Sequence, residues 1–298
     1  MRHFKTISEL HRSIGYPPPE NPLISLVMCE KLSECSIGQS EFTTDFYMIA
    51  FKKIKSGYVL YGRTKYDHDN GSMMFMKPRQ VIEINNVELE EKGFIIWIHE
   101  DFLNGYHLHS EIKKYGYFDY EANEALHLSA REEQIIWDLH SKIEGEYYNN
   151  QDEYSREIII AHIDSILKYS QRFYKRQFIN RTELSGKTVS KFNDLLASYL
   201  EKGKLQEKGL PTVKSLADLF NLSPRYLSDV LKQETGKTAI ELIHIFLISE
   251  AKNLLQGSEN SVSETAYALG FDNPPYFSRL FKKEVGMSPN EYRKNFVN

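Results

Sequence analysis

A helical pattern that occurs twice near the C-terminus, about fifty residues apart, constrains the fold of this chain more than any other feature. The first copy covers residues 226–236 and the second covers residues 276–286. Tyr, Ser, Lys, Glu and Gly recur in the same register, and the apolar positions between them keep helical spacing. An internal repeat of this kind indicates one structural unit used twice. The nature of that unit decides what the C-terminal third of the chain can do.

A second short helix and a tight turn precede the first copy. Thr212 is a suitable N-cap for a helix that ends near Asn221. Ser223 and Pro224 then supply an N-cap and a first residue for the next helix. A helix, a turn of three or four residues and a second helix make the helix-turn-helix arrangement.

The same arrangement precedes the second copy. Ser261 and Glu264 form the S-x-x-E pattern of a capping box at the start of a helix. That helix is expected to end in a turn at Gly270, and Asn273 and Pro274 are expected to begin the next helix. The sequence therefore predicts two helix-turn-helix units.

The second helix of each unit is expected to offer polar side chains to DNA. Arginine can bind guanine through two hydrogen bonds, serine can serve several base edges, and lysine suits phosphate. The candidate DNA-binding residues are Arg225, Tyr226, Ser228, Lys232, Pro275, Tyr276, Ser278, Arg279 and Lys282. The alternative is that these charges are only solvated surface. Overall charge does not support either reading, because residues 205–298 hold eleven Lys and Arg and eleven Asp and Glu.

One long helix is predicted between the two units, over residues 239–256. Its length of roughly 27 Å, at about 1.5 Å per residue, is compatible with recognition helices one DNA turn apart, roughly 34 Å. The two units are therefore expected to enter successive major grooves on one face of the duplex. The expected buried stripe of this helix is Ile240, Ile243, Leu247, Ala251, Leu254 and Leu255.

Residues 205–298 resemble the DNA-binding domain of the AraC/XylS family of bacterial transcription regulators. The matching segments are Ser215–Ala217, Leu222–Leu227, Ala251–Leu255, Ala266–Phe271, Tyr276–Lys283, Gly286–Pro289 and Tyr292–Arg293. The resemblance implies an all-α domain of two helix-turn-helix units joined by a linker helix. Two positions depart from the family pattern: Asp229 stands where many members have Arg, and Leu247 replaces an Arg that is common in the linker helix.

Short apolar runs separated by turn signals fill residues 23–98 and predict strands at 23–28, 46–51, 58–61, 73–76, 81–84 and 94–98. Evenly spaced short strands are typical of a sandwich or barrel, and the family resemblance implies a cupin-like β-barrel. Helices are expected to follow over residues 129–148, 152–178 and 186–201. The predicted fold class is α+β with several domains: 1–185 for effector sensing or dimerisation, 186–211 as helix and linker, and 212–298 as the AraC-type domain.

The N-terminal domain is expected to hold neither metal nor cofactor. His107 and His109 form an H-x-H pattern, with His68 and His99 elsewhere, but no carboxylate is placed beside them as a metal site would require. A small barrel can instead hold a ligand in its interior. Six aromatic residues lie on or beside the expected strands, and most of them are expected to be core, while a minority could line a ligand pocket. They are Tyr47, Phe51, Tyr58, Tyr61, Phe75 and Trp97.

An acidic effector could pair with Arg63, Lys65 or Arg79, although surface exposure is the alternative for all three. The helix expected over residues 152–178 carries a broad apolar stripe, which fits either burial within one chain or contact with a dimer partner. The stripe consists of Ile159, Ile160, Ile163, Ile166, Leu167, Phe173, Tyr174 and Phe178.

Together these patterns predict a sequence-specific DNA-binding transcription regulator and not an enzyme. Double-stranded DNA is the expected partner, and RNA polymerase, a small-molecule effector and a second copy of the chain are further candidates. No run is apolar enough to span a membrane and the start lacks a signal peptide, so a cytoplasmic protein is expected. Two alternatives remain: a cupin-type metal-dependent enzyme fused to a helix-turn-helix pair, and a module that binds protein. An alkyl-transfer repair protein fits poorly, because Cys29 and Cys35 both precede the repeat.

Overall fold

The computed structural model describes residues 2–29, 36–37, 40–52, 54–61, 64–65, 72–89, 93–120, 124–149, 152–180, 182–257 and 260–296. Contacts between residues divide the chain into two units, Met1–Gln177 and Phe178–Asn298. The predicted domain limits at residues 185 and 211 stay a prediction. No helix among the described residues is long and apolar enough to cross a membrane.

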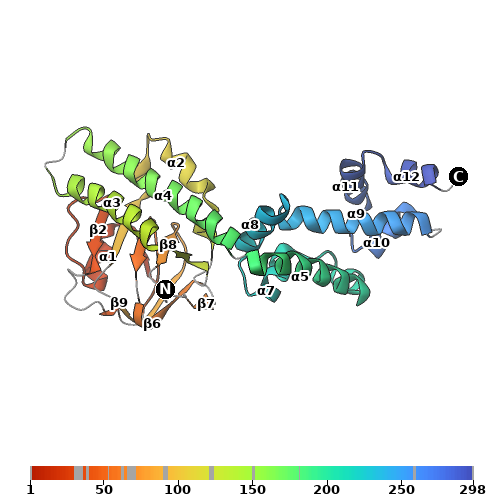
Figure 1. Cartoon of the computed structure of the whole chain (residues 1–298), viewed down its shortest axis with the longest axis horizontal. Coiled ribbons are helices and arrows are strands. Elements are labelled where there is room, and N and C mark those ends of the chain that lie inside the picture. Colours follow the sequence, from red (N-terminus) through yellow and green to blue (C-terminus); the bar gives the residue numbers. More distant parts are fainter. Residues whose placement is uncertain are drawn as a thin grey trace. The chain divides into compact units, whose positions relative to one another are not determined.

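The first unit contains two β-sheets, shown in Figure 1 in red and orange. One sheet has the order β1-β4-β9-β6-β7, and β3 also pairs with β9. Its strands are β1 (Arg2–Phe4), β3 (Ser36–Ile37), β4 (Ser40–Thr44), β6 (Ile54–Tyr61), β7 (Thr64–Lys65) and β9 (Ile82–Leu89). The other has the order β11-β8-β5-β10-β2. Its strands are β2 (Ile24–Met28), β5 (Phe46–Lys52), β8 (Ser72–Met76), β10 (Phe94–His99) and β11 (Leu126–His127). All six strands expected from the apolar runs are confirmed.

The central strand β5 is buried along its whole length because both faces of its sheet are covered. Met48 and Ala50 join a hydrophobic core that also contains Phe4 and Ile82 from the other sheet. On the opposite face, Phe51 lies 5.8 Å, centroid to centroid, from the Trp137 ring. Since successive residues of a strand point to opposite faces, every position of β5 is apolar or buried.

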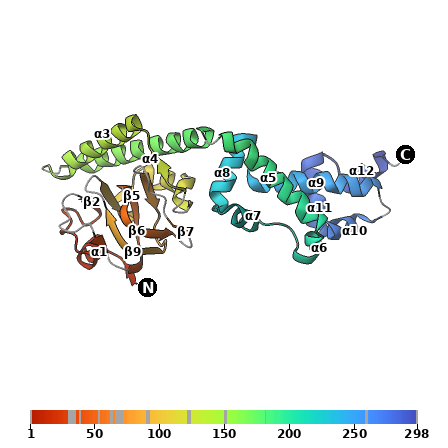
Figure 2. The same ribbon diagram turned by 60° about the horizontal axis from the view of Figure 1, so that its bottom comes forward.

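Helices cover that second face. The helical elements of this unit are α1 (Ile7–Ile14), η2 (Glu100–Leu103), α2 (Leu108–Glu111), η3 (Ile112–Lys114), η4 (Gly116–Asp119), α3 (Ala130–Tyr147) and α4 (Ser155–Asn180). Helix α1 is the exception, because its Ile7 and Leu10 pack into the core on the face of Met48 and Ala50. Figure 2 shows α3 and α4 side by side over the strands. Tyr117 Oη donates to Leu167 O at 2.9 Å, and the Phe94 ring stacks on His140 with centroids 4.2 Å apart. Ser129 and Glu132 form a capping box at the start of α3, the helix predicted over residues 129–148.

The predicted closed barrel is wrong for the described strands, because they form two separate sheets. Regular spacing of short apolar runs indicates that strands exist, but closure depends on which strands pair at the edges. The broad face of the strands is instead closed by α3 and α4. Resemblance to a cupin stays a prediction, whereas the α+β class is confirmed.

The apolar stripe of α4 is buried within the chain at all eight of the predicted positions. Tyr174, for example, stacks against Tyr117 with ring centroids 5.4 Å apart. The stripe therefore needs no second copy of the chain to cover it. Dimerisation stays a prediction.

A buried histidine ties α1 to the second sheet. His11 Nδ1 donates to Pro17 O, which can only accept, so Nε2 accepts from the Ser25 hydroxyl at 2.9 Å. His11 is 2% exposed and Ser25 is 1% exposed. Burial lowers the pKa of His11, and the bond to Pro17 only partly opposes this effect.

We expect the first unit to lose stability as the pH falls below about 6.5, the ordinary pKa of histidine. Because the pKa of His11 is lowered in the folded protein, the unfolded chain binds a proton more readily, and acid favours unfolding. Urea unfolding followed by tryptophan fluorescence at about pH 7.5 and about pH 5.5 measures this loss. His11→Asn cannot titrate and should show a smaller difference between the two pH values. An equal difference in both proteins would contradict the role of His11.

The second unit is entirely helical in the described residues. Its helices are α5 (Thr182–Glu201), α6 (Lys204–Lys208), α7 (Val213–Phe220), α8 (Pro224–Thr235), α9 (Ala239–Gly257), α10 (Val262–Ala268), α11 (Pro274–Val285) and α12 (Pro289–Phe296). One hydrophobic core joins them, and it includes Phe192, Leu205, Leu227, Leu231, Ile243, Leu247, Ala251, Leu255, Ala266, Phe277 and Phe281. Two segments predicted as helix and linker, α5 and α6, thus contribute to this core through Phe192 and Leu205.

The turn between α10 and α11 is packed against α6. Gly270 has a φ of +79°, and a Cβ built there would lie 2.6 Å from Leu205 O and 3.1 Å from Gly209 C. Both atoms belong to the backbone and cannot move aside as a side chain tip can. Glycine is therefore required at this turn for its conformation and for its size.

Gly270→Ala should destabilise the helical unit more than Gly286→Ala. Both glycines have positive φ, so each alanine bears a left-handed cost of roughly 1–2 kcal/mol. Only Gly270 has backbone in the way, since nothing lies within 4 Å of a Cβ at Gly286. The clash should add about 1–3 kcal/mol, measured as the difference in urea unfolding free energy by circular dichroism. Equal losses would show that α6 does not pack on this turn.

Candidate DNA interface

The first helix-turn-helix unit consists of α7 and α8, and its caps are those expected from the sequence. Thr212 and Ser215 form a capping box at the start of α7. Asn221 ends that helix in the left-handed conformation with φ 54°, which asparagine tolerates better than most residues. The Ser223 hydroxyl then accepts from Tyr226 N at 3.1 Å and starts α8.

The second unit repeats this geometry with α10 and α11. Ser261 and Glu264 form the predicted capping box. Gly270 takes the left-handed conformation that Asn221 takes in the first unit. Asn273 Oδ1 accepts from Tyr276 N at 3.0 Å and starts α11. The two predicted helix-turn-helix units are confirmed.

The linker helix α9 holds the two units on one core. Figure 1 shows it running between α8 and α11. Leu247 is fully buried at 0% exposure, so an apolar residue replaces the family's charged one inside the core. Ile240 was predicted to be buried but is 44% exposed, because the inward face of α9 begins at Ala239 and Ile243.

The outward face of α11 presents most of its predicted residues to solvent. Pro275, Arg279 and Lys282 are exposed, and Tyr276 is 41% exposed. Ser278 is half-buried. Among the described residues, Arg279 takes part in no ion pair. Its guanidinium is thus available for a phosphate or for a guanine edge.

The outward face of α8 differs from that of α11. Lys232 and Arg225 are exposed, but the Arg225 Nε donates to Asp229 Oδ2 at 3.1 Å. The half-buried Ser228 uses its hydroxyl to accept from Ala239 N at 3.2 Å, which joins α8 to the start of α9. The structure corrects the predicted interface at Tyr226, because the side chain of this residue is buried.

Tyr226 is 1% exposed, and its ring meets Phe178 edge-on with centroids 5.1 Å apart. Arg225 before it is exposed, but the helical turn directs Tyr226 into the core together with Leu227. The aligned residue of the second unit, Tyr276, is exposed. Aligned positions of the two copies therefore do not have the same surroundings.

Residues 216–295 match a protein-family model described as a helix-turn-helix domain. The HTH-type transcriptional activator RhaS of Escherichia coli O9:H4 (strain HS) is 38% identical over 107 residues, which are 36% of this chain and 37% of that protein. RhaS of Enterobacter sp. (strain 638) is 37% identical over 105 residues, or 35% of this chain and 36% of that protein. The C-terminal unit carries a helix-turn-helix domain of the AraC type.

The chain thus spans little more than a third of the length of these curated relatives. Two solved structures are each similar to about a third of this chain. One is the C-terminal domain of AraT, a response regulator from Geobacillus stearothermophilus, at 36% identity and a TM-score of 0.31, covering 35% of this chain and 84% of that one. The other is the DNA-binding domain of AdpA in complex with a target DNA, at 28% identity and a TM-score of 0.31, covering 35% and 91%.

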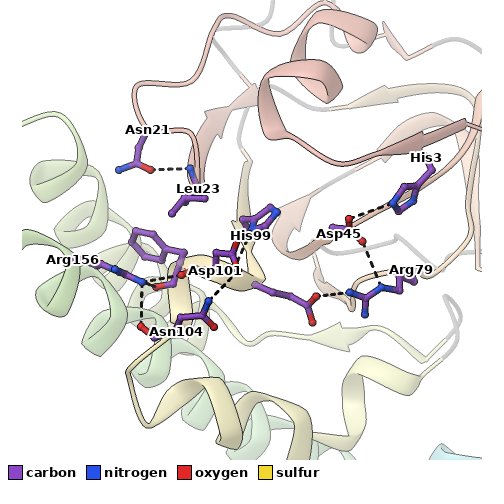
Figure 3. A network of polar contacts seen from close by, with 11 residues as sticks. His3, Asn21, Leu23, Asp45, Arg79, His99, Asp101, Asn104 and Arg156 are labelled. Atoms are coloured by element: carbon purple, nitrogen blue, oxygen red, sulfur yellow. Dashed lines mark hydrogen bonds and ion pairs between the residues drawn. The ribbon is translucent and has the colours of Figure 1, made fainter.

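Outside the AraC-type domain, the predicted effector contacts are only partly described. Arg63 lies outside the described residues. Arg79 is exposed, and its guanidinium donates to Glu100 Oε2 at 2.6 Å and lies 3.5 Å from Asp45 Oδ1 (Figure 3). The Asp45 carboxylate also lies 3.3 Å from His3 Nε2. Arg79 therefore already has acidic partners from the chain itself.

The same view shows how α4 is fixed to the segment after β10. The Arg156 guanidinium donates to three backbone oxygens, those of Asp101, Phe102 and Asn104, at 2.8–3.3 Å (Figure 3). It also lies 5.4 Å from the centroid of the Phe102 ring. This contact joins the end of the second sheet to the first turns of α4.

The histidines considered as metal ligands are dispersed. His107 Nε2 pairs with Glu111 Oε1 at 3.5 Å, and His99 Nδ1 lies 3.4 Å from Asp101 Oδ2. Within the described ranges, no three His, Cys, Asp or Glu residues are grouped to hold a metal ion. His68 and Cys35 lie outside those ranges. The expectation of no metal and no cofactor stays a prediction.

The aromatic residues of the strands have the predicted role where their side chains are described. Tyr47, Phe51, Phe75 and Trp97 are all buried. Burial raises the pKa of Tyr47 to about 12, and the nearby Glu100 adds to this shift. These residues are core packing, as expected for most of the set.

Proposed function

We propose that this chain is a sequence-specific DNA-binding transcription regulator, with α8 and α11 in successive major grooves of one duplex. The observation that carries the proposal is the doubled helix-turn-helix geometry on a single hydrophobic core. A shared core holds two recognition helices at a fixed separation, and a duplex offers major grooves about one turn, roughly 34 Å, apart. A protein-binding module would not require this repeated geometry.

The basic residues of the two helices support a DNA partner. Arg279 and Lys282 of α11, together with Lys232 of α8, are exposed although the domain as a whole carries no net charge. Local positive charge on a groove-facing surface is what phosphate and guanine recognition needs. Arg225, Ser228, Pro275, Tyr276 and Ser278 complete the proposed interface, in which Ser228 also positions α9.

Activation of transcription is the proposed direction of control, because the relatives that match the AraC-type domain are named transcriptional activators. An activator must contact the transcription machinery, so RNA polymerase is a proposed partner. We assign sensing of a small-molecule effector or dimerisation to the first unit, and binding rather than catalysis to the chain as a whole. A cytoplasmic location agrees with this function.

Fluorescence anisotropy of the full chain with DNA from upstream of its own gene tests the proposal. A scrambled duplex of equal length and composition is the control, and both are titrated across a salt series. We expect the upstream DNA to bind at least about a thousandfold more tightly. Equal, weak binding to both duplexes, by the full chain and also by residues 178–298 alone, would contradict sequence-specific recognition.

A further inference from the structure

The first recognition helix carries an ion pair on the face that the proposed function turns toward DNA. Arg225 and Asp229 are one helical turn apart on α8, and the Nε of Arg225 lies 3.1 Å from Asp229 Oδ2. Their side chains are 50% and 24% exposed. Both lie in the first half of a helix that begins at Pro224, and the N-terminal residues of a recognition helix are those that reach base edges.

The second recognition helix has no such pair at the corresponding positions. Pro275 corresponds to Arg225, and Arg279 corresponds to Asp229. The two positions together carry no net charge in α8 and one positive charge in α11. The two units therefore present different chemistry to DNA, although their backbone geometry is the same.

An acidic residue on a groove-facing surface limits what that surface can bind. Phosphates repel a carboxylate, but Arg225 neutralises the charge of Asp229 and lets it approach the duplex. In the major groove a carboxylate can accept from the N4 amino group of cytosine, which is the only base-edge contact typical of Asp. The guanidinium of Arg225, held by this carboxylate, remains half-exposed beside it.

We propose that Asp229 is a specificity-determining residue that selects a cytosine in the half-site read by α8, with Arg225 as its positioning residue. This inference rests on the proposed function. Arg279 forms no ion pair with an acidic residue among the described residues of α11. It therefore reads guanine or phosphate in the other half-site. The two half-sites should therefore differ in sequence, and the site should not be a simple direct repeat.

Selection of binding sites from a pool of random duplexes tests the proposal with three full-length proteins: the natural chain, Asp229→Asn and the control Asp218→Asn. Asp218 is an exposed residue on α7, so it matches the charge change without lying on α8. Asparagine has the size of aspartate and hydrogen-bonds adenine in the major groove. Circular dichroism of each protein checks that the helices are retained.

The natural chain and Asp218→Asn should select cytosine at one position of the first half-site. Asp229→Asn should lose that preference, shift it toward adenine, and keep the second half-site unchanged. On a duplex with the selected cytosine, Asp229→Asn should bind about 5- to 140-fold more weakly. It should also bind scrambled DNA more tightly and with a steeper salt dependence, because Arg225 is freed for phosphate.

The same half-site preference in Asp229→Asn and in the natural chain would overturn the proposal, and so would a loss of equal size on every sequence. Selection of no sequence at all by the natural chain would overturn the proposed function instead. The two failures are therefore distinguishable in one experiment.

Discussion

Phe277→Ala should lower the unfolding free energy of the helical unit by about 3–5 kcal/mol. Phe277 is fully buried, with ring centroids 5.2 Å from Phe271 and 5.9 Å from Phe281. The variant would leave a cavity in the core that both helix-turn-helix units share. Since a typical domain is stable by about 5–15 kcal/mol, this loss brings the unit close to unfolding.

The chain itself offers a way to follow the two units separately. Both tryptophans, Trp97 and Trp137, lie in the first unit, so fluorescence reports that unit, whereas far-ultraviolet circular dichroism reports the helices of both. In Phe277→Ala, the helical signal in circular dichroism should be lost at a lower urea concentration than in the natural chain. The urea midpoint measured by tryptophan fluorescence should stay the same. Tyr276→Ala, next in the chain but 41% exposed, is the control and should change little. A loss below about 1 kcal/mol in Phe277→Ala would contradict the shared core.

Arg279→Ala should weaken binding to the selected DNA site by about 1–3 kcal/mol. Arg279 is exposed on α11, and a guanidinium that forms two hydrogen bonds to guanine is the commonest specific contact in the major groove. The loss should be confined to one base position. Substitution of that base should weaken binding by the natural chain, but it should weaken binding by Arg279→Ala no further. Anisotropy with single-base variants of the site measures this.

Lys282→Ala provides the contrast expected for a phosphate contact. It should weaken binding to all sequences alike and flatten the salt dependence by about one unit of slope. Arg131→Ala, which removes an exposed arginine from α3 in the other unit, is the matched control and should leave binding unchanged. Equal losses for Arg279→Ala on the selected and scrambled duplexes would exclude a base-reading role for Arg279.

The sequence predicts most reliably those features that local chemistry determines. The capping residues Ser129, Ser223 and Ser261 begin helices where the pattern places them. An N-cap side chain accepts a hydrogen bond from the backbone N–H three residues later, and this bond needs no contact with a distant part of the chain. Helix α1 was missed, although Thr6 and Glu9 offer a similar signal and Thr6 accepts from Glu9 N. With 8 residues, α1 makes little more than two turns, so its apolar positions do not repeat often enough to indicate a helix.

Features that depend on distant contacts were predicted less well. Tyr226 and Tyr276 occupy the same place in the repeat, but only Tyr226 lies against Phe178 and becomes buried. Closure of a barrel depends on strand pairing between segments far apart in the chain, which spacing along the sequence does not report. The Arg225–Asp229 pair, in contrast, has the i, i+4 spacing of helical ion pairs and could have been predicted.

Dimethyl sulfate footprinting of the full chain on its selected duplex tests the central claim most directly, because guanine N7 lies in the major groove. Two recognition helices in successive major grooves should protect two clusters of guanines about 10 base pairs apart on one face of the DNA. Protection of a single cluster, or of two clusters on opposite faces, would contradict the claim that α8 and α11 read the duplex together.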